Sequence, residues 1–74
     1  MINFNAIEMG QRIKTLRKSK SLSQKELAHK IIVSQKTISR YENGLVHHGI
    51  DILVQLAIAL DTSTDYLLGL ADFE

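Results

Sequence analysis

Residues 23–44 read SQKELAHKIIVSQKTISRYENG, and this stretch decides the fold. It contains two helix starts eleven residues apart, and each of them opens on a serine. Ser23 and Glu26 match a capping box, in which a hydroxyl and a carboxylate accept hydrogen bonds from two otherwise unpaired backbone N–H groups. Ser34 caps a second helix through its side-chain oxygen. Only residues 31–33 separate the two predicted helices.

The second helix ends at Asn43-Gly44, because glycine adopts the left-handed conformation at low cost. Two short helices joined by so few residues must cross, which is the geometry of a helix-turn-helix unit. The apolar and aromatic positions recur at helical spacing, and this places them on the inner faces of the crossed pair. These inner positions are Leu27, Ala28, Ile31, Val33, Ile38 and Tyr41.

The opposite face of the second helix is polar. With Ile38 and Tyr41 inward, a rotation of about 100° per residue turns the polar residues outward. Glutamine hydrogen-bonds well to adenine, and arginine or lysine to guanine. An ordinary solvated helix carries the same residue types, so this face alone does not distinguish a helix that contacts DNA bases from a helix that is merely exposed to solvent. The outward residues are Lys36, Ser39, Arg40 and Asn43, with Gln35 at the N-terminal edge.

The chain closely resembles the Cro and phage-repressor type of helix-turn-helix proteins, the xenobiotic-response-element (XRE) family of bacterial regulators. The resemblance extends from about residue 9 to residue 69 in one register. The residues that carry it are Arg12-Ile13-Lys14, Leu16-Arg17, Leu22-Ser23-Gln24, Glu26-Leu27-Ala28, Ser34-Gln35, Thr37-Ile38-Ser39-Arg40-Tyr41-Glu42, Gly44, Leu53-Val54, Leu56-Ala57, Ala59-Leu60 and Asp65-Tyr66-Leu67-Leu68-Gly69.

The resemblance implies a sequence-specific DNA-binding regulator, expected to be a repressor, whose residues 34–43 enter the major groove. It implies base-edge contacts and phosphate contacts, and a buried ion pair between Arg17 and Glu42. Gln24 opens a helix, so its backbone amide and the helix dipole favour a phosphate there. The expected base contacts are Gln35, Lys36, Ser39 and Arg40; the expected phosphate contacts are Arg17, Gln24, Ser34, Thr37 and Asn43.

Length and composition fit one small domain over residues 1–74. Hydrophobic residues make up 45% of the chain but aromatic residues only 5%, so the core must be aliphatic. Cysteine is absent, which excludes disulfides and thiolate metal sites. No stretch approaches the roughly 20 apolar residues of a membrane span, and no signal sequence opens the chain. We expect a cytoplasmic protein without membrane contacts.

Charge is distributed unevenly although the net charge is only +1. Residues 1–44 carry nine cations and three anions, a balance of +6. Residues 45–74 carry no cation and five anions, a balance of −5. Such a chain has one basic side that can face phosphates and one acidic side that cannot. Simple solvation of the first helices explains some of these cations, but not their absence after Arg40.

The rest of the chain also predicts helices. We expect one over about residues 6–20, one over 49–60 and a short one within 62–69. The architecture is therefore all-α, with five short helices around one core, the helix-turn-helix at about 23–44 and the C-terminal helices at about 49–69. Apolar residues are so dense over 49–60 that most of that helix should be covered. No convincing alternating strand is found.

Catalytic and metal-binding patterns are missing, so we expect no enzyme, no catalytic residue, no metal and no cofactor. His47 and His48 are adjacent and would point in different directions, and His29 is expected on the surface. The sequence departs from the family at three places. Ile32 replaces the usual turn glycine, Leu45-Val46-His47-His48 replaces a commonly basic loop, and Gly49 replaces a capping serine.

The expected partner is double-stranded DNA with a palindromic operator, bound by a homodimer. A single reading helix covers only a few base pairs, so two-fold pairing is expected. An alternative is a protein-interaction module, such as an antitoxin that binds a partner protein and also regulates its own promoter. The candidate dimer surface lies in the acidic half and comprises Leu45, Val46, Leu68, Leu70 and Phe73.

Overall fold

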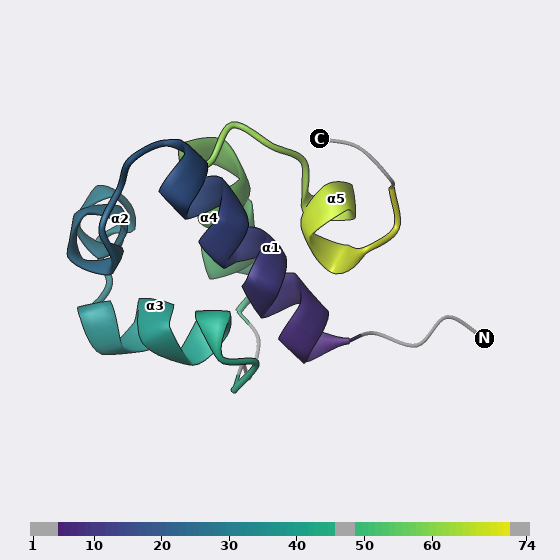
Figure 1. The fold of residues 1–74 in the computed structure, drawn as a ribbon, viewed down its shortest axis with the longest axis horizontal. Helices are drawn as coiled ribbons and strands as arrows, with labels where there is room; N and C mark the ends of the chain where they lie inside the picture. Colours follow the sequence, from purple (N-terminus) through teal and green to yellow (C-terminus); the bar gives the residue numbers. More distant parts are fainter. Residues whose placement is uncertain (1–4, 46–48, 72–74) are drawn as a thin grey trace.

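A computed structural model describes residues 5–45 and 49–71 and shows five helices within these ranges (Figure 1). The expected all-α architecture of five short helices is confirmed. None of the helices in the described part of the chain combines the length and the hydropathy that a membrane span needs. The helices are α1 (Ala6–Ser19), α2 (Gln24–Ile31), α3 (Gln35–Glu42), α4 (Ile50–Ala59) and α5 (Thr64–Leu68).

The helix starts follow the predicted serine caps. Ser23 and Glu26 form the full capping box at α2, with the Ser23 Oγ accepting from the Glu26 N–H at 3.0 Å and Glu26 Oε1 accepting from the Ser23 N–H at 2.8 Å. The hydrogen bond from the Ser23 backbone lowers the pKa of the Glu26 carboxyl. Ser34 caps α3 by accepting from the Thr37 N–H at 3.2 Å. Local hydrogen bonding therefore fixes the first turns of both α2 and α3.

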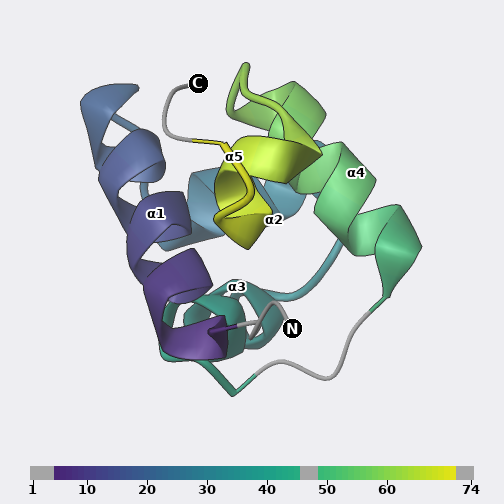
Figure 2. The same ribbon diagram turned by 90° about the vertical axis from the view of Figure 1, so that its right-hand side faces the viewer.

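The helices pack around an aliphatic core. α1 packs against α3 and α5, α2 packs against α3 and α4, and α4 packs against α5. Figure 2 shows α1 and α4 on opposite sides of the molecule, with α3 below them. The inner faces predicted for the crossed helices are buried, except that Val33 is half-buried. The buried hydrophobic residues are Met9, Ile13, Leu16, Leu27, Ala28, Ile31, Ile38, Tyr41, Leu56, Ala57, Leu60 and Leu67.

Gly10 marks the closest approach of α1 to the end of α3. A Cβ atom built at this position would lie 2.4 Å from the Tyr41 carbonyl oxygen and 2.6 Å from that of Glu42. Both neighbours are backbone atoms, which cannot rotate away as a side chain can. The absence of a side chain at Gly10 thus sets the distance between these two helices, and nothing in the periodicity of the sequence predicted it.

The prediction that α4 is mostly covered was wrong. Ile50 is 78% exposed, Val54 41% and Ile58 75%. The inner side of the helix is buried through Leu56 and Ala57, as expected for one core-facing stripe. The apolar density of this helix therefore reflects two apolar faces, of which the described chain covers only one.

Ile32 ends α2 in the left-handed conformation, with φ 57° and ψ 52°, and is 89% exposed. We expect Ile32→Gly to stabilise the fold or leave it unchanged. A β-branched residue in this region costs roughly 1–2 kcal/mol, which offsets the extra chain entropy that glycine loses on folding. The side chain contacts little, so its removal exposes no core.

Thermal unfolding of Ile32→Gly beside Lys14→Gly would measure this effect. Lys14 is exposed within α1, where glycine is expected to cost about 0.5–1 kcal/mol relative to alanine. If Ile32→Gly lost as much stability as Lys14→Gly or more, the turn would not be strained.

Candidate nucleic-acid interface

α3 separates a buried face from a polar one, as the sequence predicted. Ile38 and Tyr41 are buried in the core, and burial raises the pKa of the Tyr41 phenol. Gln35, Lys36 and Arg40 are exposed. An amide and two long cations on one accessible helix face can hydrogen-bond base edges in the major groove of duplex DNA.

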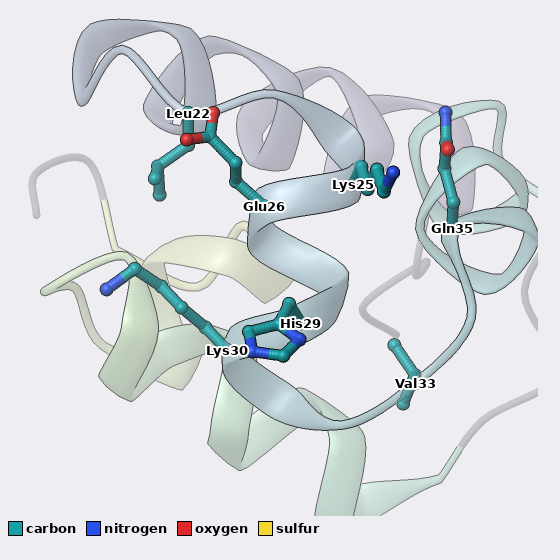
Figure 3. A pocket seen from close by; sticks show the side chains of 7 residues that line it. All are labelled: Leu22, Lys25, Glu26, His29, Lys30, Val33 and Gln35. Carbon is teal, nitrogen blue, oxygen red and sulfur yellow. The ribbon is translucent and has the colours of Figure 1, made fainter.

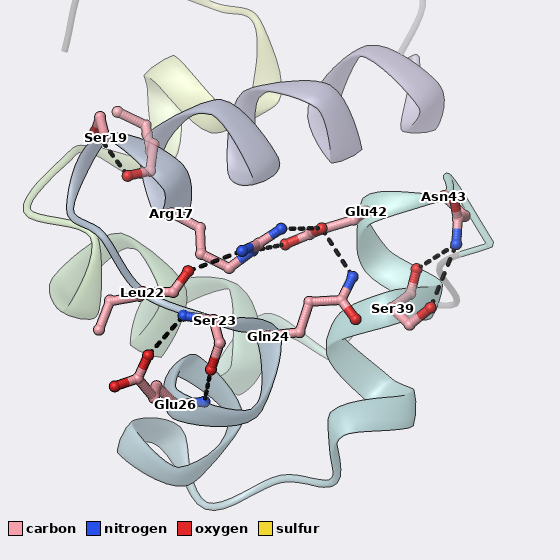
Figure 4. Close-up of polar contacts among 10 residues, drawn as sticks. Arg17, Ser19, Leu22, Ser23, Gln24, Glu26, Ser39, Glu42 and Asn43 are labelled. Carbon is pink, nitrogen blue, oxygen red and sulfur yellow. Dashed lines mark hydrogen bonds and ion pairs between the residues drawn. The ribbon is translucent and has the colours of Figure 1, made fainter.

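The remaining polar residues of α3 are partly engaged in local hydrogen bonds. Ser34 Oγ lies 3.0 Å from Thr37 Oγ1 at the start of the helix. At its end, Asn43 Nδ2 donates to the Ser39 carbonyl oxygen at 2.9 Å and approaches Ser39 Oγ at 3.4 Å (Figure 4). These bonds stabilise both ends of α3. They also orient the side chains of Ser34, Thr37, Ser39 and Asn43 next to the exposed face.

A buried polar network joins α1, α2 and α3 behind the exposed face (Figure 4). Arg17 Nε donates to Glu42 Oε2 at 2.5 Å, and its Nη2 donates to Glu42 Oε1 at 3.1 Å. Gln24 Nε2 donates to Glu42 Oε1 at 3.0 Å, and Arg17 Nη1 donates to the Leu22 carbonyl oxygen at 2.8 Å. The residues expected to form an ion pair therefore do so, and in the bidentate geometry that gives the strongest pairing.

The expectation that Arg17 also reaches a phosphate is not supported. Arg17 and Glu42 are each only 7% exposed. The guanidinium points inward and donates to Glu42 and to the Leu22 carbonyl, because a buried carboxylate needs its partner close by. Arg17 therefore positions the end of α3 from behind, with its side chain almost fully buried.

Lys25 is a candidate that sequence reasoning missed. It is exposed on the first turn of α2 and lies on the side of that helix that faces Gln35 (Figure 3). Both residues line one open depression together with Glu26, His29 and Lys30. The sequence shows Lys25 only as a cation between the capping residues Ser23 and Glu26. The crossing of α2 and α3 brings it next to Gln35.

Metal-ligating side chains do not gather in the part of the chain that the structure describes, where no group of three histidine, cysteine or carboxylate residues could hold an ion. His29 is exposed on α2, as expected. His47 and His48 lie outside the described residues.

The candidate dimer residues are only partly placed. Leu45 and Leu70 are exposed, whereas Leu68 is half-buried against the core. Val46 and Phe73 lie outside the described residues. Of the three candidates that the structure describes, two are therefore exposed and one is half-buried.

A capped helix pair that crosses tightly, with the second helix turning a polar face outward, defines a helix-turn-helix domain. The model of the helix-turn-helix family matches residues 13–67, and the chain belongs to this family. It is 40% identical over 62 residues to the uncharacterized HTH-type transcriptional regulator YobD of Bacillus subtilis (strain 168), a match that covers 84% of this chain and 55% of YobD. The chain therefore spans about half the length of that relative.

Solved structures with the same fold include complexes with DNA. The P22 c2 repressor in complex with a synthetic operator has a TM-score of 0.80 and 35% identity, covering 85% of this chain and 96% of the repressor chain. SinR from Bacillus subtilis, described as a master regulator for biofilm formation and solved with DNA, has a TM-score of 0.75 and 39% identity. That match covers 81% of this chain and 97% of the SinR chain.

Proposed function

We propose that this protein is a sequence-specific, DNA-binding transcriptional regulator that acts as a repressor and has no enzymatic activity. The observation that carries the proposal is the exposed polar face of α3, held at a fixed angle by the buried network of Arg17, Gln24 and Glu42. The fold shared with the P22 c2 repressor, which was solved on an operator, supports the same function.

Gln35, Lys36 and Arg40 are proposed to contact base edges, with Ser39 as a further donor. The three exposed residues occupy the first two turns of α3 and can reach successive base pairs when the helix lies in the major groove. Arg40 and Lys36 suit guanine, and Gln35 suits adenine. Ser39 is half-buried, so its short side chain reaches less far than the other three. Its carbonyl oxygen accepts a hydrogen bond from Asn43 Nδ2.

Phosphate contacts are proposed for residues at the helix starts and at the end of α3. Gln24 is the first residue of α2, and its donation to Glu42 uses one amide hydrogen and leaves the other for a phosphate oxygen. The backbone N–H groups and the dipole of an eight-residue helix favour an anion at the same place. The other proposed phosphate contacts are Lys25, Ser34, Thr37 and Asn43.

The charge distribution supports an orientation with α2 and α3 toward the DNA. All cations of the chain lie between Arg12 and Arg40, and the carboxylates of Asp51, Asp61 and Asp65 belong to the other half. An acidic back face avoids the phosphates and directs the basic face to them. A homodimer on a palindromic operator in the cytoplasm completes the proposal, since two reading helices double the sequence that is recognised.

The salt dependence of binding to duplex DNA tests this proposal. Six to eight neutralised phosphates per dimer, a rough figure, give a slope of log K against log salt concentration near −6. Fluorescence anisotropy with a labelled duplex of random sequence measures the slope. A slope near zero would contradict DNA binding through the basic face.

A protein-interaction module is the second candidate function. The exposed Leu45 and Leu70 and the acidic C-terminal half of the chain are the features that favour it. An antitoxin of this kind can bind a partner protein and still repress its own promoter. A slope near zero in the same titration would support this candidate over the first.

A further inference from the structure

α4 carries a row of exposed aliphatic side chains at Ile50, Val54 and Ile58, here called the α4 stripe. Residues four positions apart are neighbours on a helix surface, so the three side chains form one continuous ridge. Their exposed fractions of 78%, 41% and 75% make this the longest exposed apolar row on any helix in the described residues. Apolar residues at this spacing are typical of a helix face that packs on another helix.

Opposite charges lie at the two ends of one flank of the stripe. Asp51 begins the neighbouring row at the N-terminal end of α4 and is exposed, and Gln55 and Ala59 continue that row. At the other end, Lys30 of α2 lies beside Ile58, since both line one depression with Gln55 and Ala59. The flank is therefore negative near Ile50 and positive near Ile58.

A two-fold axis through Val54 would make this surface complementary to itself. We propose that the α4 stripe binds the α4 stripe of a second copy of this chain, with the two helices antiparallel. Ile50 of each copy then packs against Ile58 of the other, and the two Val54 side chains meet on the axis. The symmetry keeps the charged flanks on the same side, so Asp51 of each copy faces Lys30 of the other.

This inference concerns the homodimer of the proposed function, but its evidence is the geometry of α4 and of the neighbouring Lys30. A ten-residue helix is about 15 Å long, so the interface lies at the small end of the range for specific complexes. The free dimer is therefore weak and assembles efficiently where two copies are held close together. Leu45 and Leu70, the exposed leucines of the candidate surface, do not belong to the α4 stripe.

Disulfide trapping of the full chain tests the proposal without DNA. The protein has no cysteine, so a single introduced thiol reports one position. Val54→Cys is expected to form a disulfide-linked dimer at least tenfold faster under mild oxidation than Ile7→Cys. Ile7 is a matched control, because it is an isoleucine on α1 that is 62% exposed. Equal rates for the two variants would overturn the proposal.

The same method reads the orientation of the helices. Ile50→Cys and Ile58→Cys are each expected to dimerise no faster than the control when oxidised alone. A mixture of the two is expected to form the mixed dimer at the rate of Val54→Cys. If each variant linked to itself and the mixture showed no preference, the antiparallel arrangement would be excluded.

Charge reversal gives a separate readout by sedimentation equilibrium. Asp51→Lys and Lys30→Asp are each expected to weaken self-association by about tenfold, whereas the double variant should restore it. Restoration requires that the two residues meet across the interface, since both charges are exchanged in every copy. Additive weakening in the double variant would contradict the predicted register.

Discussion

Glu42→Ala is expected to destabilise the protein by about 3–5 kcal/mol, because it leaves the Arg17 guanidinium buried without its carboxylate. The guanidinium, the Gln24 amide and the Leu22 carbonyl oxygen all belong to the same network. A chain of 74 residues has a total stability of roughly 4–11 kcal/mol, so this loss would be a large fraction of it. Thermal unfolding followed by circular dichroism should show a melting temperature lower by at least about 12 °C.

Two controls separate the buried pair from ordinary charge effects. Glu8→Ala removes the exposed pair with Arg12, whose atoms lie 3.8 Å apart, and should cost well under about 1 kcal/mol. The double variant Arg17→Met/Glu42→Leu removes both charges together and should recover much of the stability, since no buried charge remains unpaired. A Glu42→Ala protein that melts within a degree or two of the wild type would contradict the network.

Gly10→Ala is expected to cost about 1–3 kcal/mol or more, although alanine is the better helix former. The new Cβ atom would lie 2.4 Å from the Tyr41 carbonyl oxygen, so α1 has to move away from the end of α3. That movement also stretches the bonds between Arg17 and Glu42, which join the same two helices. Chemical denaturation measures the loss.

Gln11→Ala serves as the matched control for Gly10→Ala. Gln11 is the next residue of α1 and is exposed, so the same substitution there should change stability by less than about 0.5 kcal/mol. The comparison isolates the helix crossing from helix propensity. Equal stabilities for the wild type and Gly10→Ala would mean that α1 and α3 do not approach as closely as described.

Local chemistry made much of the fold predictable from the sequence. The caps at Ser23 and Ser34 were predicted because a side chain bonds to the backbone only three residues away. The inward positions followed from helical periodicity alone. The pair between Arg17 and Glu42 is separated by 25 positions and was expected only from the family resemblance.

Features that depend on how helices meet could not be predicted in the same way. The role of Gly10 depends on the backbone of α3, and the position of Lys25 depends on the crossing of α2 and α3. The exposed α4 stripe contradicted the expectation of a covered helix. A high density of apolar residues indicates that a helix face is buried in some contact, but it does not indicate whether that contact is made by the same chain or by another. Arg17 was expected both in the ion pair and on a phosphate; the structure shows the ion pair, and the burial of Arg17 argues against the phosphate contact.

The network behind α3 links stability to the proposed recognition of DNA. Glu42 is the last residue of α3, and its bonds to Arg17 and Gln24 tie that end to α1 and to the start of α2. The proposed phosphate contact of Gln24 and the proposed base contacts of α3 are therefore held in one rigid arrangement. A side chain positioned in this way can distinguish base pairs with less loss of conformational entropy on binding.

Selection of binding sequences from a pool of random duplex DNA tests the central claim most directly. The wild type is expected to enrich a two-fold symmetric sequence with half-sites about one helical turn apart, roughly 34 Å. Arg40→Ala should lose the preference at one base pair of each half-site, a change of about 1–3 kcal/mol, whereas Lys25→Ala should weaken all sequences equally. Enrichment of no sequence, or the same sequence with the same preferences for Arg40→Ala, would contradict recognition of DNA by α3.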